Sequence, residues 1–335
     1  MQPLPPIEPP VPDSPARQDV SREASVPSRL AGRRVDQVAA ELFDDFSRAN
    51  LSGWIQSGEL TVDGAAVKPK QRLFGGERLR LAATLAEREN WAAAQPIRLD
   101  LIYEDEELLV VHKPAGLVVH PGAGNPDQTL VNGLLAHRPG LRLVPRAGVV
   151  HRLDKDTSGL LLVAGTLPAH QALVRAISAR EVARHYLALC EGRLVAGRTV
   201  DAPIGRDPRQ RTRQCVREGG REARTHIRVL ERFRVHTLIE AQLETGRTHQ
   251  IRVHLAHIGH PLAGDHRYAA RGRLPNAPAP LLVERLQTFR RQALHAASLA
   301  LAHPVSGEPL AFTAPPPEDL ENLIAALRED ADDGS

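Results

Sequence analysis

The sharpest change from polar to apolar residues along the chain lies at residues 151–164. The stretch 151–159, HRLDKDTSG, is mostly polar and ends in glycine, whereas the stretch 160–164, LLLVA, is entirely apolar. A polar run closed by glycine is typical of a turn, and a short aliphatic run is typical of a buried strand. The pattern predicts a turn leading into a core strand, and such a turn can present Asp154 at the mouth of a cleft.

Strand-like and helix-like patterns alternate over the rest of this region. The segment 108–122 has two β-rich runs around Lys-Pro-Ala-Gly and predicts a strand, a turn and a second strand. Thr129 and Thr166 precede apolar periodicities and predict capped helices, and Thr248 should cap a helix that follows a turn at Gly246. A last helix is predicted at about 317–327.

Residues 28–81 predict a separate small unit. An amphipathic helix is expected near Val35 to Phe43, a second helix from about Arg48 to Ile55, and a tight hairpin at Asp63-Gly64. The unit resembles an S4 RNA-binding domain, on Ser47-Arg48, on the stretch GELTVDG at 58–64 and on GGERL at 75–79.

Composition completes the domain organisation. The first fifteen residues hold seven prolines, so 1–27 should be a disordered tail. We expect an S4-like domain at 28–86, a charged, alanine-rich linker at 87–98, a catalytic domain at 99–327 and a frayed acidic tail at 328–335. The overall prediction is α+β, with a mixed, largely antiparallel sheet and flanking helices in the catalytic domain, preceded by a small α+β unit.

The 335-residue chain has only two cysteines and lacks a long apolar run or a signal-peptide pattern, so we expect a cytoplasmic protein without a membrane partner. The pI is about 9.1, although the formal net charge is only +3. Residues 206–234 contain ten arginines and four acidic residues. We interpret this segment as an RNA-facing hairpin, because arginines neutralise phosphates.

The stretch 151–159 resembles the signature of the RluA-type pseudouridine synthases, and so do the block ETGRTHQIRVH at 244–254, the block at 185–189 and much of residues 28–320. The family usually has asparagine where this chain has His112. The resemblance implies that Asp154 is catalytic and that Arg247 pairs with it. A nearby guanidinium lowers a carboxyl pKa by about 1–3 units and would keep Asp154 ionised.

Other residue roles also follow from the resemblance. Tyr186 would lie against the target base, and Arg152 would fill the space that the extruded uridine leaves. The remaining substrate-binding candidates are His151, Ile251, Arg252 and, in the S4-like unit, Arg48. Such enzymes need no cofactor or metal. Whether Asp154 attacks C1′ or removes a proton from C2′ is left open by the sequence.

Within the family, the pattern is most similar to enzymes of large-subunit rRNA, which favours the helix 69 stem-loop as target. Other 23S rRNA sites and tRNA remain alternatives. We expect RNA or a pre-ribosomal particle as partner, no DNA, and a monomer. A non-enzymatic ribosome-assembly factor is a rival interpretation, as is a metal hydrolase. The metal site would use His249, His254, His257, His260 and His266, but Arg252 among them would repel a dication.

Overall fold

The computed structural model describes residues 18–43, 46, 48–85, 92–122, 124–210, 212–269 and 272–333. The chain divides into two compact units, Met1–Trp91 and Ala92–Ser335. The division falls inside the segment 87–98 that the sequence assigns to a linker. Among the described residues, no helix is long and apolar enough to span a membrane.

The first unit has two helices, α1 (Val35–Leu42) and α2 (Arg48–Ser57), and a four-stranded antiparallel sheet. Its strands are β1 (Gln18–Ser25), β2 (Leu60–Val62), β3 (Ala65–Ala66) and β4 (Arg78–Leu85), in the order β1-β4-β2-β3. The predicted hairpin is confirmed. Asp63 and Gly64 have φ of 50° and 78°, which is the left-handed pair of a two-residue hairpin turn.

Strand β1 corrects the prediction of a disordered tail at 1–27 for residues 18–25, whereas residues 1–17 of that range lie outside the described residues. Residues 18–25 pair antiparallel with β4 over their whole length, from Gln18 opposite Leu85 to Ser25 opposite Arg78. The side chains of this strand are mostly polar, so the sequence carries almost no alternating apolar signal. The ladder of backbone hydrogen bonds to β4 does not depend on side chains, which is why the strand forms.

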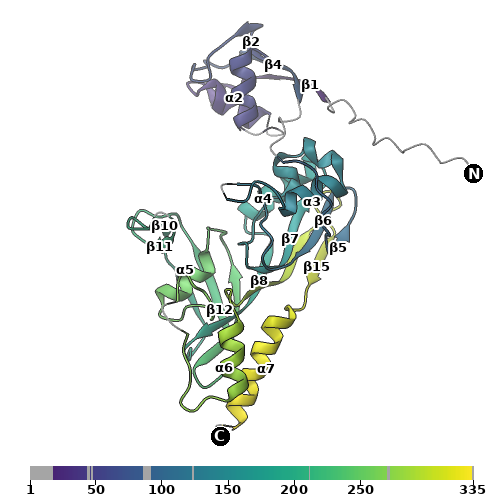
Figure 1. The fold of residues 1–335 in the computed structure, drawn as a ribbon. Coiled ribbons are helices and arrows are strands. Elements are labelled where there is room, and N and C mark those ends of the chain that lie inside the picture. Colours follow the sequence, from purple (N-terminus) through teal and green to yellow (C-terminus); the bar gives the residue numbers. More distant parts are fainter. Residues whose placement is uncertain are drawn as a thin grey trace, which may run out of the picture. The chain divides into compact units, whose positions relative to one another are not determined.

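The second unit is built on one large sheet, drawn in Figure 1, with the order β5-β6-β7-β14-β8-β13-β12-β9 and β15 paired to β14. All its strand pairs are antiparallel except β7 with β14, as the predicted mixed, largely antiparallel sheet requires. The strands are β5 (Leu101–Glu104), β6 (Leu108–Lys113), β7 (Ser158–Ala164), β8 (Ala183–Glu191), β9 (Arg198–Asp201), β12 (Arg224–Arg232), β13 (His236–Leu243), β14 (Leu294–Ala302) and β15 (Pro309–Thr313).

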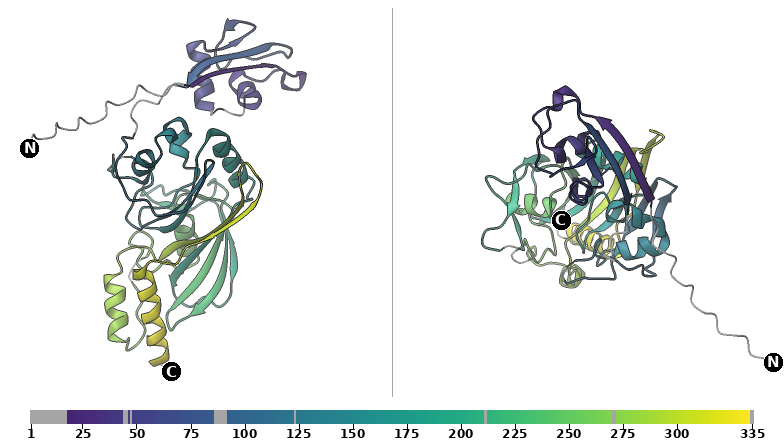
Figure 2. Two further views of the ribbon diagram at one scale, coloured as in Figure 1. Left: turned by 90° about the vertical axis from the view of Figure 1, so that its right-hand side faces the viewer. Right: turned by 90° about the horizontal axis from the view of Figure 1, so that it is seen from above.

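A separate hairpin consists of β10 (Ile204–Arg206) and β11 (Gln214–Val216). The helices of the second unit are α3 (Leu130–His137), α4 (Leu167–Ser178), α5 (Gln250–His257), α6 (Pro280–Thr288) and α7 (Glu318–Asp333). Helices α6 and α7 lie side by side (Figure 2) and share an apolar cluster with Leu189 and Leu238 of the sheet. A second cluster joins α4 to β6, β7 and β14.

Two local predictions need correction. The second strand expected after Lys-Pro-Ala-Gly does not form. Instead, the carbonyl groups of Val118 and Val119 accept the backbone N–H groups of Leu130 and Val131 at the start of α3. The acidic C-terminal segment, expected to be frayed from residue 328, continues as helix α7 to Asp333, because buried Asp330 accepts hydrogen bonds from Arg234 and from the backbone N–H of Ala279.

Candidate active site

A cavity of about 740 Å³ lies in the second unit, between the turn that carries Asp154, strand β8 and the corner from β13 to α5. Most residues that the sequence nominated as site residues line it: His151, Arg152, Asp154, Tyr186, Arg247, Ile251 and Arg252. The remaining candidate, Arg48, belongs to the first unit, and its side chain lies outside the described residues. The fold therefore gathers residues from positions 151 to 252 around one space.

Hydrogen bonds hold the turn at 154–157 in place. The backbone N–H of Thr157 donates to the carbonyl of Asp154 at 3.1 Å, which closes the turn. The buried Lys113 ammonium donates to the carbonyls of Pro114, Leu117 and Lys155 at 2.8–2.9 Å. At Gly159, φ is +114° and an added Cβ would lie 2.3 Å from the Ala296 carbonyl, so only glycine lets β7 meet β14 here.

Arg252 is the cation that holds Asp154. Its Nη1 donates to Asp154 Oδ2 at 2.9 Å, while Nε and Nη2 donate to the two carboxylate oxygens of Asp265 at 2.7 and 2.8 Å. The Asp265 side chain is 0% exposed and that of Arg252 is 9% exposed. Burial alone would lower the pKa of Arg252, but the two carboxylates outweigh it and raise that pKa. Arg252 therefore stays charged and orients the Asp154 carboxylate.

This geometry corrects the predicted pairing of Asp154 with Arg247. Arg247 lines the same cavity, but its Nε donates to the backbone carbonyl of Glu222 at 2.9 Å. The two arginines are five positions apart in one block, on opposite sides of the strand-to-helix corner. The residue that could have pointed to Arg252 is Asp265, because a buried arginine requires a carboxylate as partner.

The corner itself also differs from the prediction that Thr248 caps the helix. His249 takes the N-cap position with a left-handed backbone, φ 58°. The Gln250 side chain accepts two hydrogen bonds from the preceding loop. Its Oε1 accepts from the backbone N–H of Arg247 at 3.0 Å and from Thr245 Oγ1 at 2.7 Å. The Nε2 atom of the left-handed residue, His249, lies 3.9 Å from Asp154 Oδ1.

Tyr186 lies on β8 and is 6% exposed. Burial raises the pKa of its phenol; Arg184 opposes this shift and the Asp154 charge adds to it, so Tyr186 is neutral at physiological pH.

His151 stabilises the strand that follows the turn, because its Nε2 accepts the backbone N–H of Leu162 at 2.9 Å. Burial and the Arg184 charge lower its pKa to about 3, so it too is neutral.

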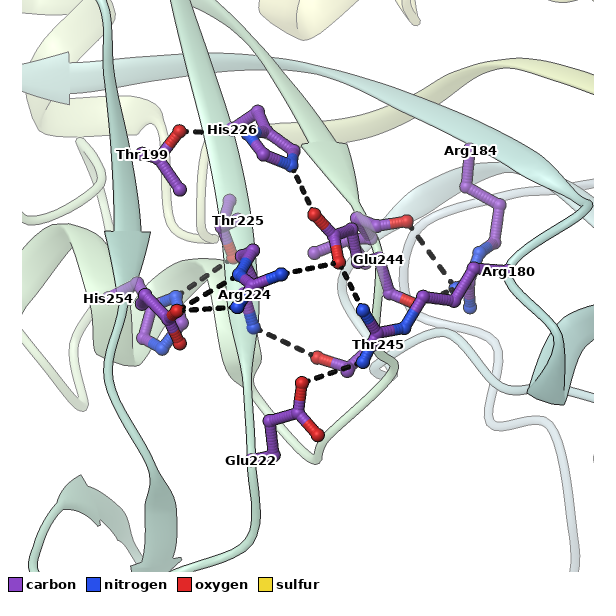
Figure 3. A network of polar contacts seen from close by, with 12 residues as sticks. Arg180, Arg184, Thr199, Glu222, Arg224, Thr225, His226, Glu244, Thr245 and His254 are labelled. Atoms are coloured by element: carbon purple, nitrogen blue, oxygen red, sulfur yellow. Dashed lines mark hydrogen bonds and ion pairs between the residues drawn. The ribbon is translucent and has the colours of Figure 1, made fainter.

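Figure 3 shows a network of ion pairs, and three of its members, Arg180, Glu222 and Glu244, line the cavity. Glu244, at the end of β13, accepts from Arg180 at 2.6 Å, from Arg224 at 3.2 Å and from His226 at 2.6 Å. Arg180 also donates to Glu222 at 2.6 Å. The network connects the segment after α4 to strands β12 and β13 on this side of the cavity.

The arginine-rich segment 206–234 divides into two parts. Its second part belongs to β12 and its flanks, where the arginines form ion pairs with acidic residues of other strands and of α7. The interpretation of the whole segment as one RNA-facing hairpin is therefore wrong for this part. The pairs are Arg224 with Asp201, Arg228 with Glu240 and Arg234 with Asp330. The first part forms the β10–β11 hairpin, which carries Arg206 and, in its loop, Arg209 and Arg213.

The histidines weighed as a metal site have other partners. His254 bonds to Thr225 and to the Ala202 carbonyl, His260 to the Glu191 carbonyl, and His266 to the Arg290 carbonyl. Within the described part of the chain, no group of three or more His, Cys, Asp or Glu side chains could hold a metal ion.

Comparison with known proteins places the site in context. The profile of the RNA pseudouridylate synthase family matches residues 107–257, which include Asp154, Tyr186 and Arg252. A protein of Xanthomonas campestris pv. campestris named ribosomal large subunit pseudouridine synthase D is 56% identical over 310 residues, covering 92% of this chain and 93% of that protein. A Pseudomonas aeruginosa protein of the same name is 51% identical over 311 residues, covering 93% and 97%.

Two solved structures of pseudouridylate synthase domain proteins are also similar to this chain. Human RNA Pseudouridylate Synthase Domain Containing 1 superposes with a TM-score of 0.54 at 27% identity, covering 70% of this chain and 90% of that chain. Human RNA Pseudouridylate Synthase Domain Containing 4 has a TM-score of 0.54 at 25% identity, covering 68% and 92%.

Proposed function

Because the chain belongs to the RNA pseudouridylate synthase family, we propose that it isomerises uridines of large-subunit (23S) ribosomal RNA to pseudouridine, with Asp154 as the catalytic residue. The observation that carries this proposal is the Asp154 carboxylate, held by buried Arg252 in a cavity that Tyr186 also lines. The relatives named as large-subunit synthases, which align with more than nine-tenths of the chain, support the choice of RNA.

The chemistry fits one carboxylate and requires no cofactor. The N-glycosidic bond from C1′ to N1 breaks, the uracil turns, and C1′ bonds to C5. The proton of C5 leaves and N1 gains a proton, so the reaction is an isomerisation without net hydrolysis or redox change. Asp154 acts at the sugar, either as the nucleophile at C1′ or as the base at C2′.

The other side chains position the uridine. The Tyr186 ring stacks on the extruded uracil, and its hydroxyl is the group near the base that can exchange a proton. Arg152, which is exposed and lines the cavity, occupies the space that the uridine vacates, at a cost in unstacking of about a few kcal/mol. Arg247 and the arginines of the β10–β11 hairpin contact phosphates.

The first unit acts as an S4-like RNA-binding domain that holds neighbouring rRNA. Joined through the segment around residue 90, it raises the effective concentration of the catalytic unit at its target loop. We assign the helix 69 stem-loop as that target. The protein works as a monomer in the cytoplasm.

The test is to map pseudouridines in rRNA and tRNA of cells without the protein, and of the same cells complemented with wild type, Asp154→Asn or Asp156→Asn. Asp156→Asn is the matched control, because it removes a carboxylate from the same turn. We expect loss of pseudouridine at helix 69, restored by wild type and Asp156→Asn only. Loss confined to tRNA contradicts the rRNA target, loss at other 23S sites contradicts helix 69, and restoration by Asp154→Asn contradicts the catalytic role.

A further inference from the structure

Tyr268 makes contacts to both the active site and the β10–β11 hairpin. It lies in the turn that follows Asp265, and its hydroxyl sits between two nitrogen atoms. The backbone N–H of Gln214, the first residue of β11, donates to the Tyr268 oxygen at 3.0 Å. His249 Nδ1 lies 2.7 Å from the same oxygen.

The first hydrogen bond favours one direction for the second. A tyrosine hydroxyl has one proton to donate, and the Gln214 N–H already occupies an acceptor position on its oxygen. The remaining donor is the O–H, and the nitrogen within reach is His249 Nδ1. When Nδ1 accepts this proton in a hydrogen bond, a neutral imidazole carries its own proton on Nε2.

The protonation states support this arrangement. Burial lowers the pKa of His249; Asp154 opposes this shift, whereas Arg252 and Arg267 reinforce it, so the imidazole is neutral. Burial also raises the pKa of Tyr268, which keeps its hydroxyl protonated. The ring is held in place, because the guanidinium of Arg213 lies 5.0 Å and that of Arg252 5.1 Å from its centroid.

The Nε2 side of His249 points to the catalytic carboxylate. The distance from Nε2 to Asp154 Oδ1 is 3.9 Å, while the other oxygen, Oδ2, is bonded to Arg252. With a proton on Nε2, His249 presents a donor to Oδ1 across the 3.9 Å that separate the two atoms. With a lone pair on Nε2, it would present a repulsive electron pair to the same oxygen.

We infer that Tyr268 is a positioning residue that fixes the tautomer of His249 so that an N–H, and not a lone pair, faces the Asp154 carboxylate. The Gln214 contact makes this setting depend on the hairpin being in place. The inference rests on the proposed function of Asp154.

The first arm of the test reads the tautomer without substrate. The full-length protein, labelled with ¹⁵N-histidine, is compared by two-bond ¹H–¹⁵N correlation spectra with Tyr268→Phe, and His249 is identified by the signals missing in His249→Gln. We expect the Nε2–H form in wild type and a mixture in Tyr268→Phe. An Nδ1–H form in wild type, or no change in Tyr268→Phe, overturns the inference.

The second arm measures kcat and KM on a helix 69 stem-loop transcript. Tyr268→Phe keeps the ring and should lower kcat by roughly 10- to 100-fold with little change in KM, as the loss of an orienting hydrogen bond does elsewhere. His249→Gln, whose amide N–H can take the place of Nε2–H, should keep most of the activity, whereas His249→Asn, whose amide matches Nδ1, should not.

The double variant separates positioning from folding. In the His249→Gln background there is no tautomer to set, so Tyr268→Phe should have no further effect on kcat. A multiplicative loss in the double variant, or an unchanged kcat in Tyr268→Phe, overturns the inference. If Asp154→Asn proves active, the proposed function fails, and the tautomer spectra still decide whether Tyr268 sets His249.

Discussion

Replacing Arg252 by methionine should both destabilise the protein and slow the reaction. The guanidinium donates hydrogen bonds to two carboxylates, and the side chain of one, Asp265, is 0% exposed. Removing one partner of a buried ion pair costs about 3–5 kcal/mol, because the other charge remains buried without its counterion. We therefore expect the free energy of unfolding to fall by about that amount.

The effect on catalysis follows from the single bond to Asp154. A hydrogen bond to a charged group contributes about 1.5–3 kcal/mol. If that contribution is lost in the transition state, kcat/KM should fall by roughly 10- to 160-fold, at 1.36 kcal/mol for each factor of ten. The assay is single-turnover conversion of a uridine-containing stem-loop, with urea unfolding of the same samples.

Two further variants make this prediction specific. Adding Asp265→Asn to Arg252→Met removes the buried unpaired charge, so stability should partly recover while activity should not. Arg247→Met is the matched control: its Nε bonds only to the Glu222 carbonyl, so stability should change by no more than about 0.5 kcal/mol. If Arg247→Met abolishes turnover while Arg252→Met leaves it unchanged, the assignment of Arg252 is refuted.

Three other results are expected. Burial lowers the pKa of Lys113 to about 7 from its usual 10.5. Between these two values the folded state binds fewer protons than the unfolded state, so the free energy of unfolding should rise with pH in that window. Urea titrations of Lys113→Met should show a smaller rise. Deleting residues 1–86 should weaken modification of ribosomal particles far more than of a short stem-loop, and equal losses on both substrates would argue against an RNA-holding role. Asp330→Ala should lower the free energy of unfolding by about 1–3 kcal/mol, because the buried Asp330 Oδ1 accepts from Ala279 N–H and from Arg234; an unchanged urea midpoint would contradict this.

Several predictions that depended on local signals were successful. The Asp63-Gly64 turn, the helix starts at Thr129 and Thr166 and the buried strand after residue 159 require only short stretches of sequence. Asp154 and Tyr186 were nominated by resemblance, and the structure places both around one cavity. Their chemical roles stay predictions.

The failures share a dependence on distant partners. Strand β1 exists because β4 offers it a ladder, and α7 extends past residue 328 because Asp330 bonds to Arg234 and Ala279. The choice between Arg247 and Arg252 depends on a left-handed residue at His249, a backbone conformation that is uncommon for residues other than glycine. In the first two cases the deciding contact is made by residues that are distant in the sequence. In the third, the deciding feature is an unusual backbone conformation.

The position of β14 has a consequence for synthesis of the chain. This strand, residues 294–302, lies between β7 and β8 and pairs with both. At about 5–20 residues per second, a ribosome needs on the order of ten seconds to extend the chain from the end of β7 to β14. During that interval the two halves of the sheet have no strand between them, and each exposes an unpaired edge. A nascent chain should therefore gain protease resistance in one late step, when β14 leaves the exit tunnel and inserts.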